Sequence, residues 1–133
     1  MAKEMTAEEV VATMHIGELA DRSQMSLRTI RHYDEVGLLK PSGRTEGGFR
    51  LYTERDFTRL MLIRRMKPLG FALEEMSELL RVIDILETVD KGEGGATVRG
   101  ALDGFIEQAT VRRAKLEEQI GMADEFIELL RAQ

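Results

Sequence analysis

Apolar residues recur along most of the chain at intervals of three and four, which is the spacing of α-helices. This spacing predicts four helices, at about 16–22, 27–36, 54–67 and 73–89. Ser26 and Thr53 are suited to cap the second and third of them, and Gly37 is suited to end the second. Between Leu38 and Tyr52 four residues are Gly or Pro and the apolar period shifts towards two, so we predict a small β-hairpin there.

A glycine-rich linker at 90–96 precedes one long predicted helix at 97–133. Apolar residues recur along this helix at intervals of seven. A helix of roughly 35 residues is about 50 Å long, more than the N-terminal part of the chain could cover. We therefore expect its apolar stripe to pack against the same helix of a second chain in a coiled coil. The alternative is that the helix folds back over the third and fourth helices. The predicted dimerisation residues are Phe105, Ile106, Ala109, Leu116, Ile120, Ala123, Ile127 and Leu130.

The composition of the 133 residues narrows the class of protein. The chain has no cysteine, which excludes a disulfide framework, a thiolate metal site and a thiol nucleophile. It has no apolar run that could cross a bilayer, and charged residues stand where a secretory segment would be apolar. We therefore expect a soluble, cytoplasmic protein. Residues 1–14 are expected to be a flexible N-terminal extension.

The net charge of −5 is unevenly distributed along the chain. Residues 15–67 hold eleven basic against seven acidic residues, whereas residues 68–133 hold seven against fourteen. The first of these regions is therefore suited to meet a polyanion such as DNA, and the second is not.

The first two predicted helices, joined by a three-residue turn, form a candidate helix-turn-helix. On the second helix Arg28, Arg31 and His32 fall on one face, which we place opposite Leu27 and Ile30. Laid in a major groove, this face would present two guanidinium groups and an imidazole to bases and phosphates. Taken alone, the helix is equally compatible with an ordinary solvated surface.

The predicted hairpin favours the DNA-binding interpretation. Lys40, Arg44 and Arg50 flank its glycine-rich tip directly after the basic helix. A β-ribbon that carries basic residues beside a recognition helix is a wing, which contacts the neighbouring phosphate backbone. Positive charge on three consecutive elements of an acidic chain is not explained by solubility alone.

The stretch from Met14 to Leu80 resembles the DNA-binding domain of the MerR family of transcription regulators. The resemblance rests on four motifs in order: IGELA, SLRTIRHYDEVGLLKP, RTEGGFRLYTERDFTRL and LIRRMKPLGFALEEMSELL. It implies a mostly α fold, with a winged helix-turn-helix and linking helices at 15–89. It also implies that the long helix pairs antiparallel with its twin in a homodimer.

The resemblance further implies a function and a set of DNA-binding residues. A dimer of this kind binds a palindromic operator in a promoter spacer and distorts it, so that RNA polymerase is activated or repressed. The alternative is a coiled-coil adaptor or an architectural DNA-binding protein without ligand-dependent switching. Asp34 stands where the family has an acid, and we expect it to be a structural partner of a nearby arginine such as Arg50. The DNA-binding residues implied are Arg28, Arg31, His32, Tyr33, Lys40, Arg44, Arg50 and Tyr52.

Three departures from the family pattern affect local stability. Gln24 stands where the turn commonly has Gly, at a cost of about 1 kcal/mol if its φ is positive. Ala72 lacks the hydroxyl that would cap the fourth helix, and His15 is a poor cap for the first.

We expect no cofactor and no metal, and leave any small-molecule effector unidentified. A hard cation would have to be held by Asp84, Glu87, Asp90 and Glu93, which we interpret as solvated acids. A small-molecule pocket would have to be lined by Phe105, Phe126 and the methionines Met76 and Met122, for which ordinary packing is the alternative. An enzyme is not expected, because His32 and Asp34 point apart on a helix and have no nucleophile beside them.

Overall fold

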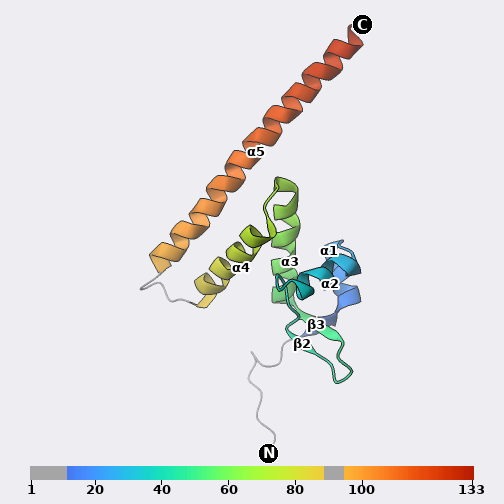
Figure 1. The fold of residues 1–133 in the computed structure, drawn as a ribbon, viewed down its shortest axis with the longest axis vertical. Helices are drawn as coiled ribbons and strands as arrows, with labels where there is room; N and C mark the ends of the chain where they lie inside the picture. The colour runs from blue at the N-terminus through green and yellow to red at the C-terminus, as the bar shows by residue number, and fades with distance from the viewer. Residues whose placement is uncertain (1–11, 89–94) are drawn as a thin grey trace, which may run out of the picture. The chain divides into compact units, whose positions relative to one another are not determined.

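The structure is a computed structural model that describes residues 12–88 and 95–133. It is mostly helical, as predicted, with one small antiparallel sheet (Figure 1). The chain divides into two compact units, Met1–Pro68 and Leu69–Gln133. None of the described helices is long and apolar enough to cross a membrane.

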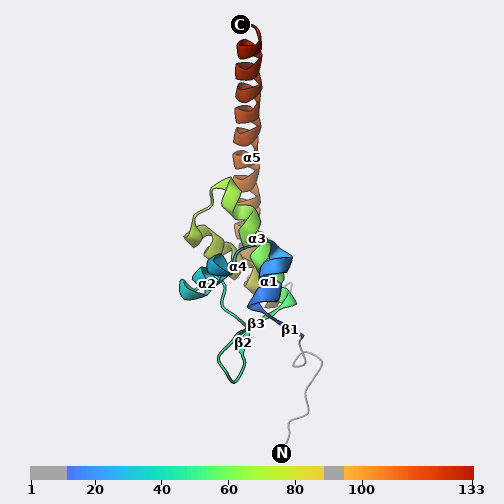
Figure 2. The ribbon, with the colours of Figure 1, turned by 90° about the vertical axis from the view of Figure 1, so that its right-hand side faces the viewer.

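The sheet of the first unit has three short strands, β1 (Thr13–His15), β2 (Gly43–Arg44) and β3 (Arg50–Thr53). Their order is β1-β3-β2, and both pairings are antiparallel. The loop between β2 and β3 projects from the sheet (Figure 2). The predicted hairpin is therefore confirmed. Strand β1 was not predicted, because a three-residue strand is too short to show an alternating pattern. Thr13 and Met14 pair with β3, so the expectation that they belong to a flexible extension is wrong, while residues 1–11 of that extension lie outside the described range.

Helices α1 (Ile16–Ser23) and α2 (Leu27–Glu35) form the helix-turn-helix. Gln24 ends α1 at φ 58° and ψ 34°, so the positive φ for which the sequence indicated a cost is present. The Ser26 hydroxyl accepts a hydrogen bond from the Thr29 amide at 3.1 Å and caps α2. His15 makes no side-chain cap for α1. Gly37, at φ 77°, follows the end of α2 as predicted.

The buried face of α2 differs from the prediction in one residue. Ile30 and Tyr33 are buried, whereas Leu27 is exposed. At 100° per residue Leu27 lies closer to Arg31 than to the buried pair. The expectation that Leu27 faces the core is therefore wrong, and the exposed face of α2 includes this leucine.

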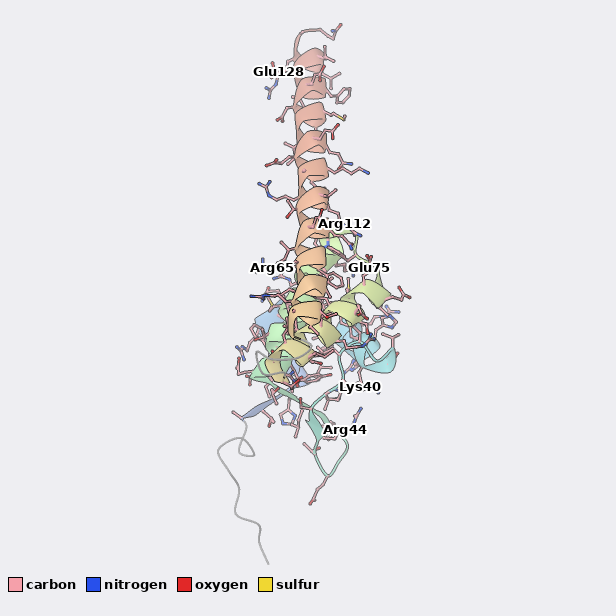
Figure 3. All side chains as sticks on the ribbon, turned by 90° about the vertical axis from the view of Figure 1, so that its left-hand side faces the viewer. Lys40, Arg44, Arg65, Glu75, Arg112 and Glu128 are labelled. Carbon is pink, nitrogen blue, oxygen red and sulfur yellow. The ribbon has the colours of Figure 1, made fainter. Side chains whose placement is uncertain are left out.

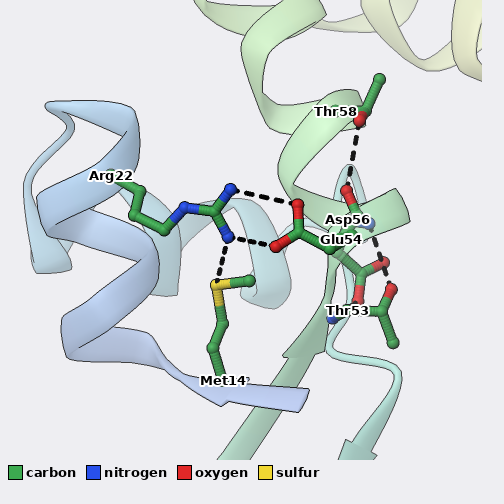
Figure 4. A network of polar contacts seen from close by, with 6 residues as sticks. All are labelled: Met14, Arg22, Thr53, Glu54, Asp56 and Thr58. Carbon is green, nitrogen blue, oxygen red and sulfur yellow. Dashed lines mark hydrogen bonds and ion pairs between the residues drawn. The ribbon is translucent and has the colours of Figure 1, made fainter. Parts of the chain in front are cut away.

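Helix α3 (Glu54–Met66) begins with a complete capping box formed by Thr53 and Asp56, as predicted. Its first residue, Glu54, receives two hydrogen bonds from the guanidinium of Arg22 in α1 (Figure 4). The same guanidinium lies 4.2 Å from the centre of the Phe57 ring and contacts the Met14 sulfur. The ion pair lowers the pKa of Glu54 and raises that of Arg22. This cluster fixes the helix-turn-helix to α3.

The second unit is a helical hairpin of α4 (Leu73–Thr88) and α5 (Gly95–Arg131) (Figure 1). Residue 72 has no capping hydroxyl, and its amide instead donates to the Glu75 carboxylate at 2.8 Å. The Arg112 guanidinium lies 3.9 Å from the centre of the Phe71 ring and donates to the Leu69 carbonyl. It also pairs with Glu75 (both are labelled in Figure 3). Arg112 therefore ties the start of the unit to α5. A 3-10 turn, Lys67–Leu69, precedes α4.

The apolar stripe of α5 has two different environments. Its first half packs on α4 of the same chain, where Phe105 approaches Phe71 with ring centres 6.4 Å apart. From Leu116 onward the large apolar residues are exposed. Up to about Arg112 one side of α5 packs on α4, so the alternative of folding back within the chain holds for the fourth helix in this part. The residues after Arg112 have no covering element among the described residues, and their pairing with a second chain stays a prediction.

Candidate nucleic-acid interface

The exposed face of α2 carries the predicted basic residues. Arg28, Arg31 and His32 are all exposed, as is the acid Glu35 one turn further along. This follows from burial of Ile30 and Tyr33, since a helix that buries one face must present the other. After α2 the amides of Leu38 and Leu39 both donate to the Tyr33 carbonyl, and both leucines are buried. These contacts turn the chain after α2 and leave Lys40 exposed at the start of the wing (Figure 3).

The wing is joined to α2 by one carboxylate. Asp34 Oδ2 accepts a hydrogen bond from Arg50 Nε at 2.7 Å and another from Arg44 Nη2 at 3.1 Å. The Asp34 side chain is 11% exposed, that of Arg50 23% and that of Arg44 47%. The hydrogen bond to Asp34 raises the pKa of Arg50. The expected pairing of Asp34 with Arg50 is confirmed, and the sharing with Arg44 is a further contact that sequence reasoning missed.

This arrangement gives the two wing arginines different roles. Arg50 is mostly covered and directed at Asp34, so it holds the wing in place. Arg44 is half exposed and has further N–H groups to offer, because a guanidinium carries five donors. It is therefore the wing arginine suited to meet a phosphate.

The two tyrosines named as DNA-binding residues are core residues. Tyr33 is 4% exposed and Tyr52 is 0% exposed. Burial raises the pKa of both phenols. The Tyr52 hydroxyl has no hydrogen-bond partner within the described parts of the chain. We therefore correct the expectation for these two residues: their rings are buried and do not offer a contact surface.

A second carboxylate, that of Asp56, holds the segment that leads into β2 of the wing. Asp56, which is buried at the start of α3, accepts hydrogen bonds from the Ser42 hydroxyl at 2.5 Å and from the Thr53 amide at 2.9 Å. The sequence predicted the cap formed with Thr53 but not the contact with Ser42, which is fourteen residues away in the chain. Asp56 thereby fixes both ends of the segment that contains the hairpin.

The predicted dimerisation residues lie along α5 but do not share one environment. Phe105 and Ala109 are half-buried in the part of α5 that packs with α4. The other six are exposed: Ile106, Leu116, Ile120, Ala123, Ile127 and Leu130.

The pocket considered for a small molecule does not form within one chain. Phe105 and Phe126 are 21 residues apart on one straight helix, or about 30 Å. Met76 is buried in α4, whereas Met122 is exposed on α5. A hollow of about 410 Å³ does lie along α5, lined by Gly104, Glu107, Gln108, Val111 and Arg112. It contains none of the four residues expected to line a pocket.

The acidic residues considered for a cation are only partly described. Asp90 and Glu93 lie outside the described residues, while Asp84 and Glu87 belong to α4. Among the residues that the structure does describe, no group of three or more His, Cys, Asp or Glu side chains is placed to hold a metal ion.

An exposed basic helix, a wing beside it and a carboxylate that joins the two define a winged helix-turn-helix protein. The chain belongs to the MerR family: residues 14–82 match the family described as MerR HTH family regulatory protein. The resemblance noted in the sequence is therefore confirmed.

Relatives and solved structures agree with this assignment. The chain is 46% identical over 69 residues to the mercuric resistance operon regulatory protein of Bacillus cereus, a match that covers 52% of each chain. The chain thus spans about half the length of this curated relative. It is 33% identical over 114 residues to the HTH-type transcriptional regulator HmrR of Rhizobium leguminosarum bv. viciae, covering 80% of this chain and 84% of that one.

One similar solved structure is that of HiNmlR, described as a MerR family regulator lacking the sensor domain, bound to promoter DNA. It is 28% identical to this chain, with a TM-score of 0.63, and the match covers 90% of this chain and 86% of that one.

Proposed function

We propose that the protein is a transcriptional regulator that binds promoter DNA through α2 and the wing. The observation that carries this proposal is the basic face of α2 joined to the wing through Asp34, in a domain of the MerR family. In this proposal Arg28, Arg31 and His32 enter the major groove and read base edges. Lys40 and Arg44 contact phosphates on either side.

The test is DNA binding by the full chain at several salt concentrations. Duplexes selected from a random pool supply the operator, and a scrambled duplex of equal length is the control. Arg31→Ala should reduce discrimination between the two duplexes, because a base contact is lost. Lys40→Ala should weaken both equally and reduce the slope of log K against log salt by about one unit per phosphate contact. Equal behaviour of the two variants would contradict the division of roles.

We also propose that the protein acts as an antiparallel homodimer through α5. At 100° per residue Leu116, Ile120, Ala123, Ile127 and Leu130 fall within an arc of about 80°. This arc continues the stripe whose first half packs on α4. Because α4 has 16 residues and α5 has 37, the stripe extends far beyond the cover that its own chain supplies. A second copy supplies a helix of matching pattern and length.

The last third of α5 is apolar over a wider arc. Met122, Phe126 and Leu129 are also exposed, and they extend the arc to roughly 180°. A seam between two helices needs only about half of that. We therefore propose that the end of α5 contacts two helices of the partner rather than one.

Light scattering tests the dimer. Leu116→Asp places a charge in the middle of the stripe at a cost of several kcal/mol, so the variant should be monomeric. Thr110→Asp, which adds the same charge on the exposed polar side of α5, is the matched control and should remain a dimer. A dimeric Leu116→Asp protein would show that α5 does not form the interface.

In the complete proposal the dimer binds a palindromic operator in a promoter spacer and distorts it, so that RNA polymerase is affected indirectly. The protein acts in the cytoplasm and is not an enzyme. Footprinting of the purified complex tests the distortion: hyperreactive bases are expected at the operator centre. A uniformly protected centre, with no effect on transcription from the selected promoter, would favour an architectural role.

A further inference from the structure

The tip of the wing carries an exposed aromatic residue to which the sequence assigned no role. Phe49 stands directly before β3 and is 68% exposed, more than any other large apolar residue described. In the same unit the other exposed large apolar residues, Leu27 and Val36, lie at the ends of α2. An exposed phenyl ring at the end of a projecting hairpin contributes little to the core, so its position calls for a different explanation.

The backbone around this ring is tightly fixed. The Thr45 amide donates to the Phe49 carbonyl at 2.9 Å, and the Phe49 amide donates to the Thr45 hydroxyl at 3.1 Å. The Gly48 amide donates to the Thr45 carbonyl at 2.9 Å, and Gly48 adopts φ 85°. The turn is therefore closed by its own hydrogen bonds, and the ring projects from a rigid base.

The ring also has a defined position relative to the glycine before it. A Cβ atom built on Gly47 would lie 3.2 Å and 3.4 Å from two ring carbons of Phe49. One edge of the ring, Cδ2 and Cε2, therefore lies against the Gly47 backbone. Most of the residue is open to solvent, as its exposed fraction of 68% shows.

A guanidinium group lies at the same tip. Arg44 Nη1 donates to the Gly48 carbonyl at 2.9 Å, one residue before Phe49, while Arg44 Nη2 holds Asp34. A positive charge is thus held at the residue that precedes the apolar ring. The phosphate and the deoxyribose of a DNA strand have this same alternation of anionic and apolar groups.

We propose that Phe49 is a DNA-contacting residue whose ring packs against a deoxyribose of the strand that Arg44 holds by its phosphate. This inference rests on the proposed DNA-binding function. A phenyl ring has no hydrogen-bonding group with which to read a base edge, and it has no charge with which to bind a phosphate. The apolar face of the sugar is the part of the backbone that it fits. The contact is therefore independent of both DNA sequence and salt concentration.

The experiment compares Phe49→Ala with wild type on the selected operator and on the scrambled duplex, over a series of salt concentrations. Affinity should fall by roughly tenfold on both duplexes, the change expected for losing partial cover of one phenyl ring in each wing. The salt slope should stay unchanged. Arg44→Ala should lower the slope, because it removes a phosphate contact. Phe49→Leu should retain most of the affinity, since it remains apolar.

Two controls make the result specific. Val111→Ala removes an exposed apolar side chain of α5, outside the proposed interface with DNA, and should bind as wild type does. Thermal unfolding of Phe49→Ala should match wild type, because the ring is exposed. Wild-type affinity of Phe49→Ala on both duplexes, a loss confined to the operator or a change in salt slope would each overturn the proposal. Failure of the wild-type protein to bind any duplex would instead overturn the proposed function.

Discussion

Asp34→Asn separates two effects of opposite sign at the interface. The substitution removes a negative charge from the proposed DNA-binding surface, which by charge alone should strengthen binding. It also replaces the carboxylate that holds Arg44 and Arg50 with a neutral group. We expect the second effect to dominate and operator affinity to fall by about tenfold.

The magnitudes support this order. At roughly 8 Å from a phosphate in a water-like medium, one charge contributes about 0.5 kcal/mol, and salt screens it further. Restricting a released arginine side chain on binding costs about 0.5–1.5 kcal/mol, and two arginines in each wing depend on Asp34. The folded state should also lose about 1–2 kcal/mol, because Arg50 is mostly covered and would lose a charge-assisted hydrogen bond at 2.7 Å.

Binding isotherms on the operator and the scrambled duplex provide the assay, at a temperature where both proteins are folded. Glu35→Gln is the matched control, since it removes the same charge from the neighbouring exposed position of α2. The control should bind both duplexes slightly more tightly. If Asp34→Asn behaves like this control, Asp34 does not position the wing arginines for DNA, and the reasoning is refuted.

Three further predictions concern stability. Gln24→Gly should raise the free energy of unfolding by about 1 kcal/mol in denaturant unfolding, because Gln24 has φ 58° and glycine adopts this conformation without strain. An unchanged free energy of unfolding would show that Gln24 is not strained. Glu54→Gln should be less stable than wild type at pH 7, and the difference should close at acidic pH. Arg22 lowers the pKa of Glu54, so the stability that the pair contributes is fully present above the unfolded pKa of about 4.3 and is lost as pH falls through the lowered pKa of the folded state. A difference between the two proteins that does not shrink with falling pH would argue against the pair. Arg112→Lys should cost about 1–2 kcal/mol in the same unfolding assay, because an ammonium cannot stack on Phe71 while donating to the Leu69 carbonyl, and a neutral result would mean that the stacking is unimportant.

Local rules determined much of the structure from the sequence. The cap formed by Ser26 and the capping box of Thr53 each depend on residues three positions apart. Such contacts form within one turn of the chain, so spacing alone reveals them. The same holds for the basic face of α2, which follows from the helical period once Ile30 is assigned to the core.

Contacts between distant parts of the chain decided the remaining features. The sequence pattern at Tyr33 and Tyr52 fits a DNA-binding residue as well as a core residue. Only the packing of the first unit shows that both tyrosines are buried. Period alone could not divide the stripe of α5, because covered and uncovered halves carry the same pattern. The two halves differ because α4 packs on only one of them. The length of α4 determines where the covered part of the α5 stripe ends.

The proposed DNA-binding surface gives the clearest example of a contact that the sequence alone does not determine. The sequence placed Arg44 and Arg50 on a wing and suggested Asp34 as a partner for one arginine. That a single carboxylate oxygen accepts from both depends on how the hairpin lies against α2, across separations of ten and sixteen residues. Spacing fixes which face of an element a residue occupies, whereas its partner on another element depends on how the two elements pack.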